Sequence, residues 1–144
     1  MPPDEPFDPA RDYPVGERRP DFVTTASGRP LDEVTVDAVI AGEVTADELR
    51  ISPDALHRQA LVAAASGRPA LVANFERAAE LTGIPDDRLL EIYEALRPRR
   101  STGAQLEAIA VDFETRYSAP LNAAFVREAA DAYLQRNLLL TEPG

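Results

Sequence analysis

Proline is distributed unevenly along this chain, and its positions limit where helices can form. Six of the first 20 residues are proline, which has no backbone N–H and whose ring clashes with the preceding helical turn. Residues 1–33 are therefore predicted to form an extended N-terminal arm. The alternative for the first dozen residues is a flexible terminus without fixed structure. The large apolar side chains of the arm are too few to build a core, so they need another surface to lie against: Phe7, Tyr13, Val15, Phe22 and Val23.

Beyond the arm, proline and glycine mark the ends of predicted helices. Ser52-Pro53 places a capping hydroxyl before a proline at the first helical position, and Gly67 supplies a left-handed residue at the end. Further helices are expected from Val36 to Ala41, from Pro69 to Gly83, from Pro85 to Pro98, from Ser101 or Thr102 to Tyr117, and from Pro120 through Tyr133, with a single turn at Thr45. No segment has the pattern of a strand. The fold class is predicted as all-α, a small helical bundle over residues 34–140 joined to the Pro-rich arm.

Apolar residues recur at helical spacing and give each longer helix one predicted core face. The faces are Leu56, Ala60, Ala63 and Ala64; Leu71, Phe75, Ala78, Ala79 and Thr82; Leu89, Ile92, Tyr93 and Leu96; Leu106, Ile109, Ala110, Phe113 and Tyr117; and Leu121, Phe125, Ala129, Ala132 and Tyr133. Many of these positions are alanine, which buries little area compared with a Leu or Phe worth roughly 1.5–3 kcal/mol when fully buried. We therefore expect a protein that is marginally stable alone and is completed by a partner.

Composition excludes several classes of function. The 144 residues suffice for one modest domain, and the absence of cysteine excludes disulfides and thiolate sites. The net charge of −10 disfavours nucleic acid as a partner, and the absence of lysine excludes Schiff-base chemistry. The longest apolar run, Ala60–Ala65, is too short for a membrane span, and the first residues do not resemble a signal peptide, so a cytoplasmic location is expected.

Two features could be taken for catalytic groups, and each has a structural alternative. His57 is the only histidine, so it has no second histidine for a metal site or a relay, and we interpret it as a surface or interface residue. Asp86 and Asp87 could form an acid/base pair, but adjacent carboxylates in a first helical turn also favour the positive end of the helix dipole. We interpret the pair as structural.

The remaining candidates are a basic cluster and a set of aromatic residues. Arg97, Arg99 and Arg100 could bind phosphate, pair with carboxylates of another subunit, or lie on a solvated helix end, and the interface interpretation is preferred. The aromatic residues have the helical spacing of core or interface packing: Phe113, Tyr117, Phe125 and Tyr133. No phosphate loop, nucleophile elbow or metal-ligand cluster is present in the sequence. We therefore predict no catalytic, cofactor-binding or metal-binding residue on this chain.

Several strings of residues nevertheless resemble one enzyme family in order and spacing. The main strings are Leu49–Ser52, Asn74–Leu81, Ile84–Arg88 and Ala95–Ser101, with shorter matches at Ser27-Gly28, Leu31-Asp32, Gln59-Ala60, Gly67-Arg68, Ile92-Tyr93, Ala108–Ala110 and Asn122–Glu128. Together they resemble the small subunit of adenosylcobalamin-dependent diol and glycerol dehydratases. The resemblance runs from about Tyr13 to Arg136, and Met1 to Asp12 match nothing in it.

The resemblance implies a role inside a larger enzyme that converts 1,2-propanediol to propionaldehyde, or glycerol to 3-hydroxypropionaldehyde. In this family the large subunit carries the radical chemistry, adenosylcobalamin lies between the large and medium subunits, and the helical small subunit packs on the large one in a dimer of heterotrimers. No catalytic residue carries over to this chain. A location within a bacterial microcompartment is left open, and the alternative function is a free-standing helical adaptor that has kept the subunit fold.

Overall fold

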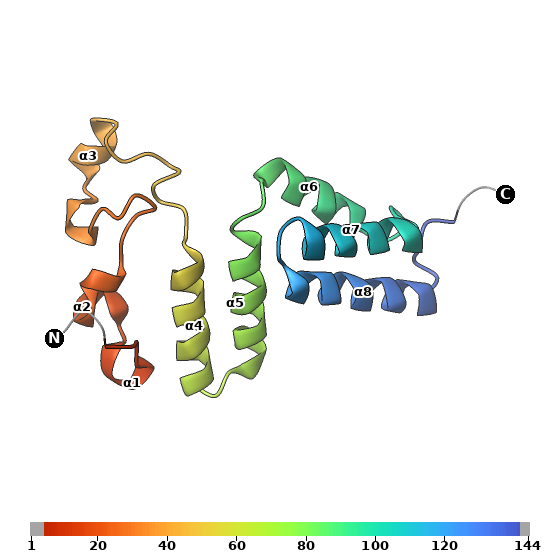
Figure 1. The fold of residues 1–144 in the computed structure, drawn as a ribbon, viewed down its shortest axis with the longest axis horizontal. Coiled ribbons are helices and arrows are strands. Elements are labelled where there is room, and N and C mark those ends of the chain that lie inside the picture. The colour runs from red at the N-terminus through yellow and green to blue at the C-terminus, as the bar shows by residue number, and fades with distance from the viewer. Residues whose placement is uncertain (1–4, 142–144) are drawn as a thin grey trace. The chain divides into compact units, whose positions relative to one another are not determined.

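The computed structural model describes residues 5–141 and contains helices and connecting segments (Figure 1). Within this range no strand is present, and the only β-type pairing is an isolated bridge between Thr24 and Pro30. The all-α prediction is therefore confirmed. The chain divides into two compact units, with the boundary between Ala79 and Glu80. None of the helices in the described range has the length and apolarity that a membrane span requires.

The first unit begins with short helical turns instead of a uniformly extended arm. They are α1 (Pro9–Asp12), α2 (Val15–Arg18), the 3-10 turns η1 (Pro20–Phe22) and η2 (Leu31–Glu33), and α3 (Val36–Ile40). None of the turns before α3 exceeds four residues, as the prolines predict. The arm thus has more local structure than its composition suggests, because single turns fit between successive prolines.

Two longer helices complete this unit, α4 (Pro53–Ala65) and α5 (Pro69–Leu81), whose last residues pass into the second unit. The helix start predicted at Ser52 is confirmed, since its hydroxyl accepts a hydrogen bond from the N–H of Ala55. The stop is confirmed as well: Gly67 has φ +68°, and the N–H of Arg68 donates to the carbonyl of Ala63. This pattern is a Schellman motif, and it turns the chain back into α5.

The second unit contains α6 (Asp86–Ala95), α7 (Gly103–Thr115) and α8 (Pro120–Gln135), of which α7 and α8 form an antiparallel hairpin (Figure 1). Thr102, one of the two predicted caps, starts α7, and Gln105 completes a capping box with it. The main hydrophobic core lies here: Ile84, Ile92, Leu106, Ile109, Ala110, Phe113, Ala119, Ala123 and Val126.

The predicted core face of α8 is wrong by about one residue. Leu121 and Phe125 are 47% and 45% exposed, whereas Asn122, Ala123 and Val126 are buried. Hydrogen bonds to Glu80 account for this difference. The Glu80 carboxylate accepts hydrogen bonds from the N–H groups of Leu121 and Asn122, at 3.0 and 2.9 Å, and from the Asn122 amide at 2.7 Å. These contacts turn Asn122 inward and fix the rotation of the helix.

The other predicted faces are largely confirmed, with three exceptions. The stripe on α7 is buried as expected, but Tyr93 on α6 is 67% exposed, Leu71 on α5 is 39% exposed, and Ala64 on α4 is exposed. Tyr93 and Ala64 lie at the edge of their stripes, and Leu71 lies in the first turn of α5.

The buried side chains of the first unit are small. Its buried apolar residues are Ala38, Val44, Leu56, Ala60, Ala63 and Ala79, and two charged residues, Asp12 and Arg19, are buried with them. Four of these six apolar residues are alanine, so burial stabilises this unit much less than the second one. The prediction of an alanine-rich core therefore applies mainly to residues 5–79.

Candidate subunit interface

The sequence-derived candidates for catalysis lie in structural contacts. Nδ1 of His57, on α4, lies 2.8 Å from Oε2 of Glu76 on α5, and the histidine side chain is half exposed. His57 therefore links two helices at the surface of the first unit. Asp86 and Asp87 begin α6 as predicted, and Asp87 Oδ1 accepts a hydrogen bond from the N–H of Arg88. Their position fits the dipole interpretation.

The arginine cluster lies at the turn after α6. Arg97 donates to Glu94 of its own helix at 3.0 Å, and the backbone N–H of Arg99 donates to the carbonyl of Leu138 at 2.7 Å. Arg99 holds a left-handed conformation with φ +65°, which is uncommon for a residue with a side chain. The three guanidinium groups are exposed, so the cluster tethers the C-terminal segment through its backbone and leaves its side chains at the surface.

The four aromatic residues do not form one pocket. Phe113 is buried in the core of the second unit, where Tyr117 and Tyr133 pack against the core residues. The hydroxyl of Tyr133 donates to the carbonyl of Leu96 at 2.6 Å. Phe125 lies at the surface instead, so packing accounts for three of the four.

The arm is fastened to α4 through Phe22. Two guanidinium groups contact the Phe22 ring, with Cζ of Arg19 at 3.8 Å and Cζ of Arg58 at 4.7 Å from the ring centroid. Arg58 also donates to the carbonyl of Phe22 at 2.9 Å, and the ring of Phe7 meets Phe22 edge-on at 6.2 Å. The apolar groups of the arm are too few to form a core and need another surface, and for Phe22 that surface is a cationic side chain of α4.

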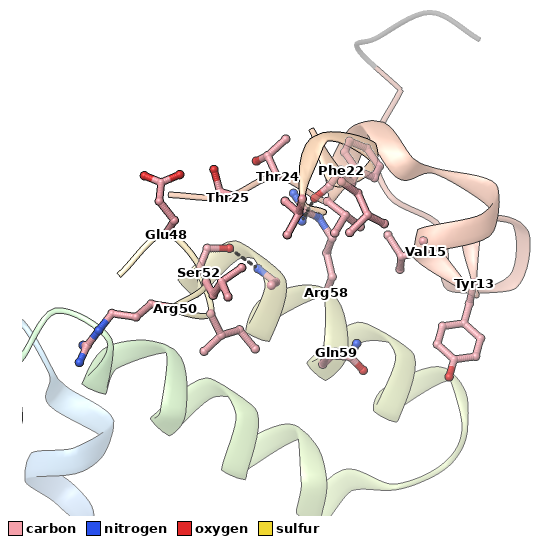
Figure 2. A pocket seen from close by; sticks show the side chains of 17 residues that line it. Tyr13, Val15, Phe22, Thr24, Thr25, Glu48, Arg50, Ser52, Arg58 and Gln59 are labelled. Atoms are coloured by element: carbon pink, nitrogen blue, oxygen red, sulfur yellow. Dashed lines mark hydrogen bonds between the residues drawn. The ribbon is translucent and has the colours of Figure 1, made fainter. Parts of the chain in front are cut away.

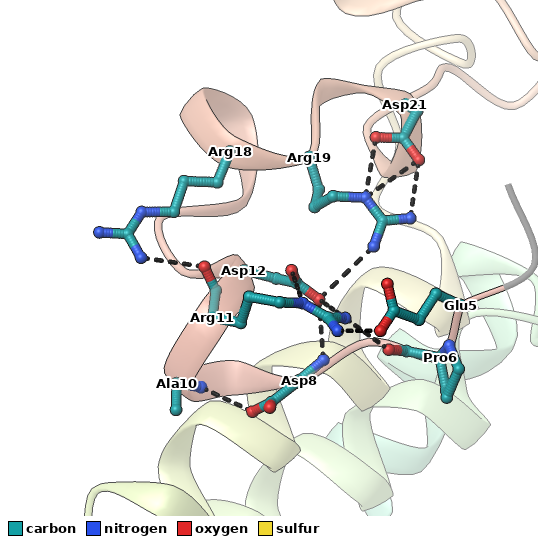
Figure 3. A network of polar contacts seen from close by, with 9 residues as sticks. All are labelled: Glu5, Pro6, Asp8, Ala10, Arg11, Asp12, Arg18, Arg19 and Asp21. Carbon is teal, nitrogen blue, oxygen red and sulfur yellow. Dashed lines mark hydrogen bonds and ion pairs between the residues drawn. The ribbon is translucent and has the colours of Figure 1, made fainter. Parts of the chain in front are cut away.

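A network of charges organises the arm around Asp12 (Figure 3). Its carboxylate accepts hydrogen bonds from Arg11 at 2.7 and 2.8 Å and from the N–H of Asp8 at 2.9 Å, and Nη1 of Arg19 lies 3.5 Å away. Arg19 reaches Asp21 with its other donors. The hydrogen bonds from Arg11 hold the pKa of the Asp12 carboxyl well below its usual range, against the opposing effect of burial. Asp12 therefore stays ionised at neutral pH.

An apolar groove of about 530 Å³ lies between the arm and the start of α4 (Figure 2). In Figure 2, Glu48 and Arg50 lie at one end of the groove, Tyr13 and Val15 lie at the other, and Phe22 and Arg58 lie between them. The lining is mainly apolar: Tyr13, Val15, Phe22, Val23, Leu31, Val34, Leu49, Ile51 and Ala55. Sequence reasoning missed this groove because its walls come from segments up to about 45 residues apart in the chain. The sequence offered one signal of this groove, the large apolar residues Leu49 and Ile51 just before the helix start at Ser52. In the structure both residues are exposed.

The described residues provide surfaces for binding and few groups for catalysis. Within residues 5–141, no group of three or more His, Cys, Asp or Glu side chains gathers in a way that could hold a metal ion. Most of the groups with shifted pKa values lie in arginine–carboxylate pairs, such as Arg127 with Glu107 and Glu114, and the pKa of Glu48 is lowered mainly by hydrogen bonds from the hydroxyls of Ser27 and Thr25. Ion pairs of this kind also occur as purely structural contacts on protein surfaces, so the shifted pKa values do not require a catalytic role.

Comparison with known proteins identifies the kind of assembly to which these surfaces belong. Residues 9–140 match the family model described as dehydratase small subunit. This chain belongs to the dehydratase small subunit family. The propanediol dehydratase small subunits of Salmonella typhimurium (strain LT2) and Citrobacter freundii are each 53% identical to it over 128 residues, which is 89% of this chain and 74% of each relative.

Membership of the dehydratase small subunit family confirms the resemblance found in the sequence and implies partner subunits. It also corrects the start of the matched region. The family match begins at Pro9, whereas the resemblance seen in the sequence begins at about Tyr13 and leaves out Met1 to Asp12. Pro9–Asp12 form α1, which carries the buried carboxylate of Asp12, so the polar network of the arm lies within the family region.

Proposed function

We propose that this chain is the non-catalytic small subunit of a coenzyme B12-dependent diol dehydratase. The reaction would convert 1,2-propanediol to propionaldehyde and water, or glycerol to 3-hydroxypropionaldehyde and water. The observation that carries this proposal is the 53% identity to two propanediol dehydratase small subunits over 89% of the chain. The diol would be selected by residues of another subunit.

The role proposed for the chain is to pack on the large catalytic subunit and stabilise it. Support comes from the distribution of apolar surface. The first unit buries few large side chains, while Leu31, Val36, Ile40, Leu49 and Ile51 are each more than 40% exposed. Exposed apolar surface of this extent is typical of a protein interface. Burial against a larger subunit would supply the stabilisation that the alanine-rich core lacks.

Adenosylcobalamin would be held by the other subunits, in contact with the large and medium ones. The groove formed by the described residues does not fit a corrin cofactor. Its volume of about 530 Å³ is that of a small-ligand pocket, and His57, the one histidine, is not among the residues that line it. We assign no step of the radical reaction to this chain.

The proposed assembly is a dimer of heterotrimers in the cytoplasm. The acidic chain favours protein partners over nucleic acid. The sequence left open whether residues 1–12 direct packaging within a bacterial microcompartment, and residues 1–4 lie outside the described range.

Co-expression tests the proposal. The large and medium subunits from the same source are produced with and without this chain, and soluble yield and adenosylcobalamin-dependent turnover of 1,2-propanediol and glycerol are measured. We expect both yield and turnover to fall by at least about tenfold when the chain is left out. The free-standing adaptor would be favoured instead if the two preparations had equal yield and turnover, and if this chain were monomeric and did not bind the other subunits.

A further inference from the structure

The segment from Leu31 to Ile51 presents an apolar face that the described residues leave uncovered. Val36, Val39 and Ile40, one turn apart on α3, are 74%, 47% and 79% exposed. Ala38 lies on the opposite side of this helix and is 9% exposed. The helix therefore turns its larger apolar side chains outward and its small one inward, the reverse of what a surface helix of a monomer does.

This face is held in one conformation by local hydrogen bonds. The Thr35 hydroxyl accepts from the N–H of Ala38 and caps the start of α3. At the other end Gly42 has φ +76°, the N–H of Glu43 donates to the carbonyl of Ala38, and the N–H of Gly42 donates to that of Val39. These two bonds form a Schellman motif. Val44, 3% exposed, anchors the segment just after it. A preformed surface of this kind binds with a smaller loss of conformational entropy.

The same segment supplies apolar residues to the groove of Figure 2. Leu31, Leu49 and Ile51 line the groove, yet they are 42%, 55% and 56% exposed. A partner that covers the outer face of α3 and inserts apolar side chains into the groove would bury the middle of the segment and its two ends together.

The charges on this segment define the chemistry of the partner. Residues 31–51 contain six acidic residues and one arginine, a net charge of −5, which is half of the −10 of the whole chain. Arg50 lies 3.5 Å from Asp47, and Arg29, just before the segment, reaches Glu33 and Glu43 only at 3.7 and 3.9 Å. Most of the carboxylates are exposed. The apolar face is thus bordered by negative charge.

We propose that residues 31–51 form the docking surface for the large dehydratase subunit, and that this partner presents an apolar patch bordered by arginine and lysine side chains. The inference rests on the proposed function and adds the surface and its chemistry. A second copy of this chain is disfavoured as the occupant, because a two-fold contact would place one acidic border against another. Phosphate backbones and anionic lipid surfaces are repelled for the same reason.

The apolar part of the proposal is tested with matched variants. All three subunits are co-expressed with a tag on the large subunit, and the amount of small subunit retained after washing is measured. The double variant Val36→Gln/Ile40→Gln should be retained about tenfold less than wild type, since it removes two central apolar contacts. The control Leu90→Gln/Tyr93→Gln changes two residues of similar exposure on α6 and should be retained within about twofold of wild type. Circular dichroism checks that both variants fold.

The charge part has its own pair of variants. Asp32→Asn/Asp37→Asn should weaken retention at low salt and flatten its decrease with added salt, because two attractive charges are removed. Glu128→Gln/Asp131→Asn removes the same charge from exposed positions on α8 and should leave the salt dependence unchanged.

The outcomes separate this inference from the proposed function. If wild type is retained and both surface variants are retained equally well, or the controls lose as much, residues 31–51 are not the docking surface while the subunit role stands. If wild type is not retained at all, both proposals fail. If the isolated chain self-associates and Val36→Gln/Ile40→Gln disperses it without affecting retention, the face contacts a second copy and the inference is overturned.

Discussion

Substitutions at different residues of this chain should change the free energy of unfolding by very different amounts, depending on how exposed the replaced side chain is. Leu106 is 1% exposed in the core of the second unit, and Leu90 is 66% exposed on α6. Leu106→Ala should lower the free energy of unfolding by about 2–5 kcal/mol, because it removes buried area and leaves a cavity. Leu90→Ala should change it by less than about 0.5 kcal/mol. Urea titration of both variants measures these changes. Similar losses of unfolding free energy in the two variants would mean that Leu106 is not a core residue.

Phe22 is expected to matter more for assembly than for folding. Its ring is partly buried and contacts Arg19 and Arg58, so Phe22→Ala should cost about 1–2 kcal/mol of stability, less than the 3–5 kcal/mol of a fully buried phenylalanine. Because the ring also lines the groove, retention by the large subunit should fall about tenfold. Deleting Tyr13 to Asp32 should have the same effect on retention. Unchanged retention together with loss of helical signal would assign Phe22 to the fold alone.

Asp12 should make stability depend on acid. Its pKa in the folded chain lies below the roughly 3.9 of an unfolded aspartate, so its contribution is complete above that pH and is lost as the pH falls further. Asp21, Glu48, Glu107 and Glu114 are shifted in the same direction. The stability difference between wild type and Asp12→Asn should therefore shrink as the pH is lowered from about 7 to about 3. Urea midpoints measured across this range test it, and a constant difference would contradict the lowered pKa.

Among the secondary-structure elements, α8 has a helix cap supplied from a distant part of the sequence. Glu80 precedes this helix by about 40 residues and accepts three hydrogen bonds at its start. Glu80→Ala should cost about 1–3 kcal/mol, because two helix N–H groups and a buried amide lose an acceptor. Glu128→Ala, an exposed change on the same helix, should cost less than about 0.5 kcal/mol. Thermal unfolding followed by circular dichroism compares the two, and equal shifts would argue against the capping role.

The contrast between α7 and α8 shows what a sequence can predict. The start of α7 is local, with Thr102 and Gln105 three residues apart, and its stripe of apolar residues was predicted correctly. The start of α8 at Pro120 was also predicted, but its rotation depends on Glu80, whose distance in sequence hides the contact. Leu121 and Phe125 were therefore assigned to the core, although they lie at the surface.

At the scale of the whole molecule, the same distinction applies to the candidate interface. Helix ends, the all-α class and the family could be read from short strings of residues. The groove could not, because its walls meet only after the arm has folded back on α4. The sequence did indicate that large apolar side chains were scarce in the core, and the structure locates that scarcity in residues 5–79.

The unequal cores have a consequence for the cell. A copy of this subunit made in excess would have its weakest part in residues 5–79, and local opening there would admit proteases before the bundle of α6, α7 and α8 yields. Orphan copies would then be cleared while docked ones survive. The supply of the larger subunit would in this way set how much of its companion accumulates, without any dedicated regulator.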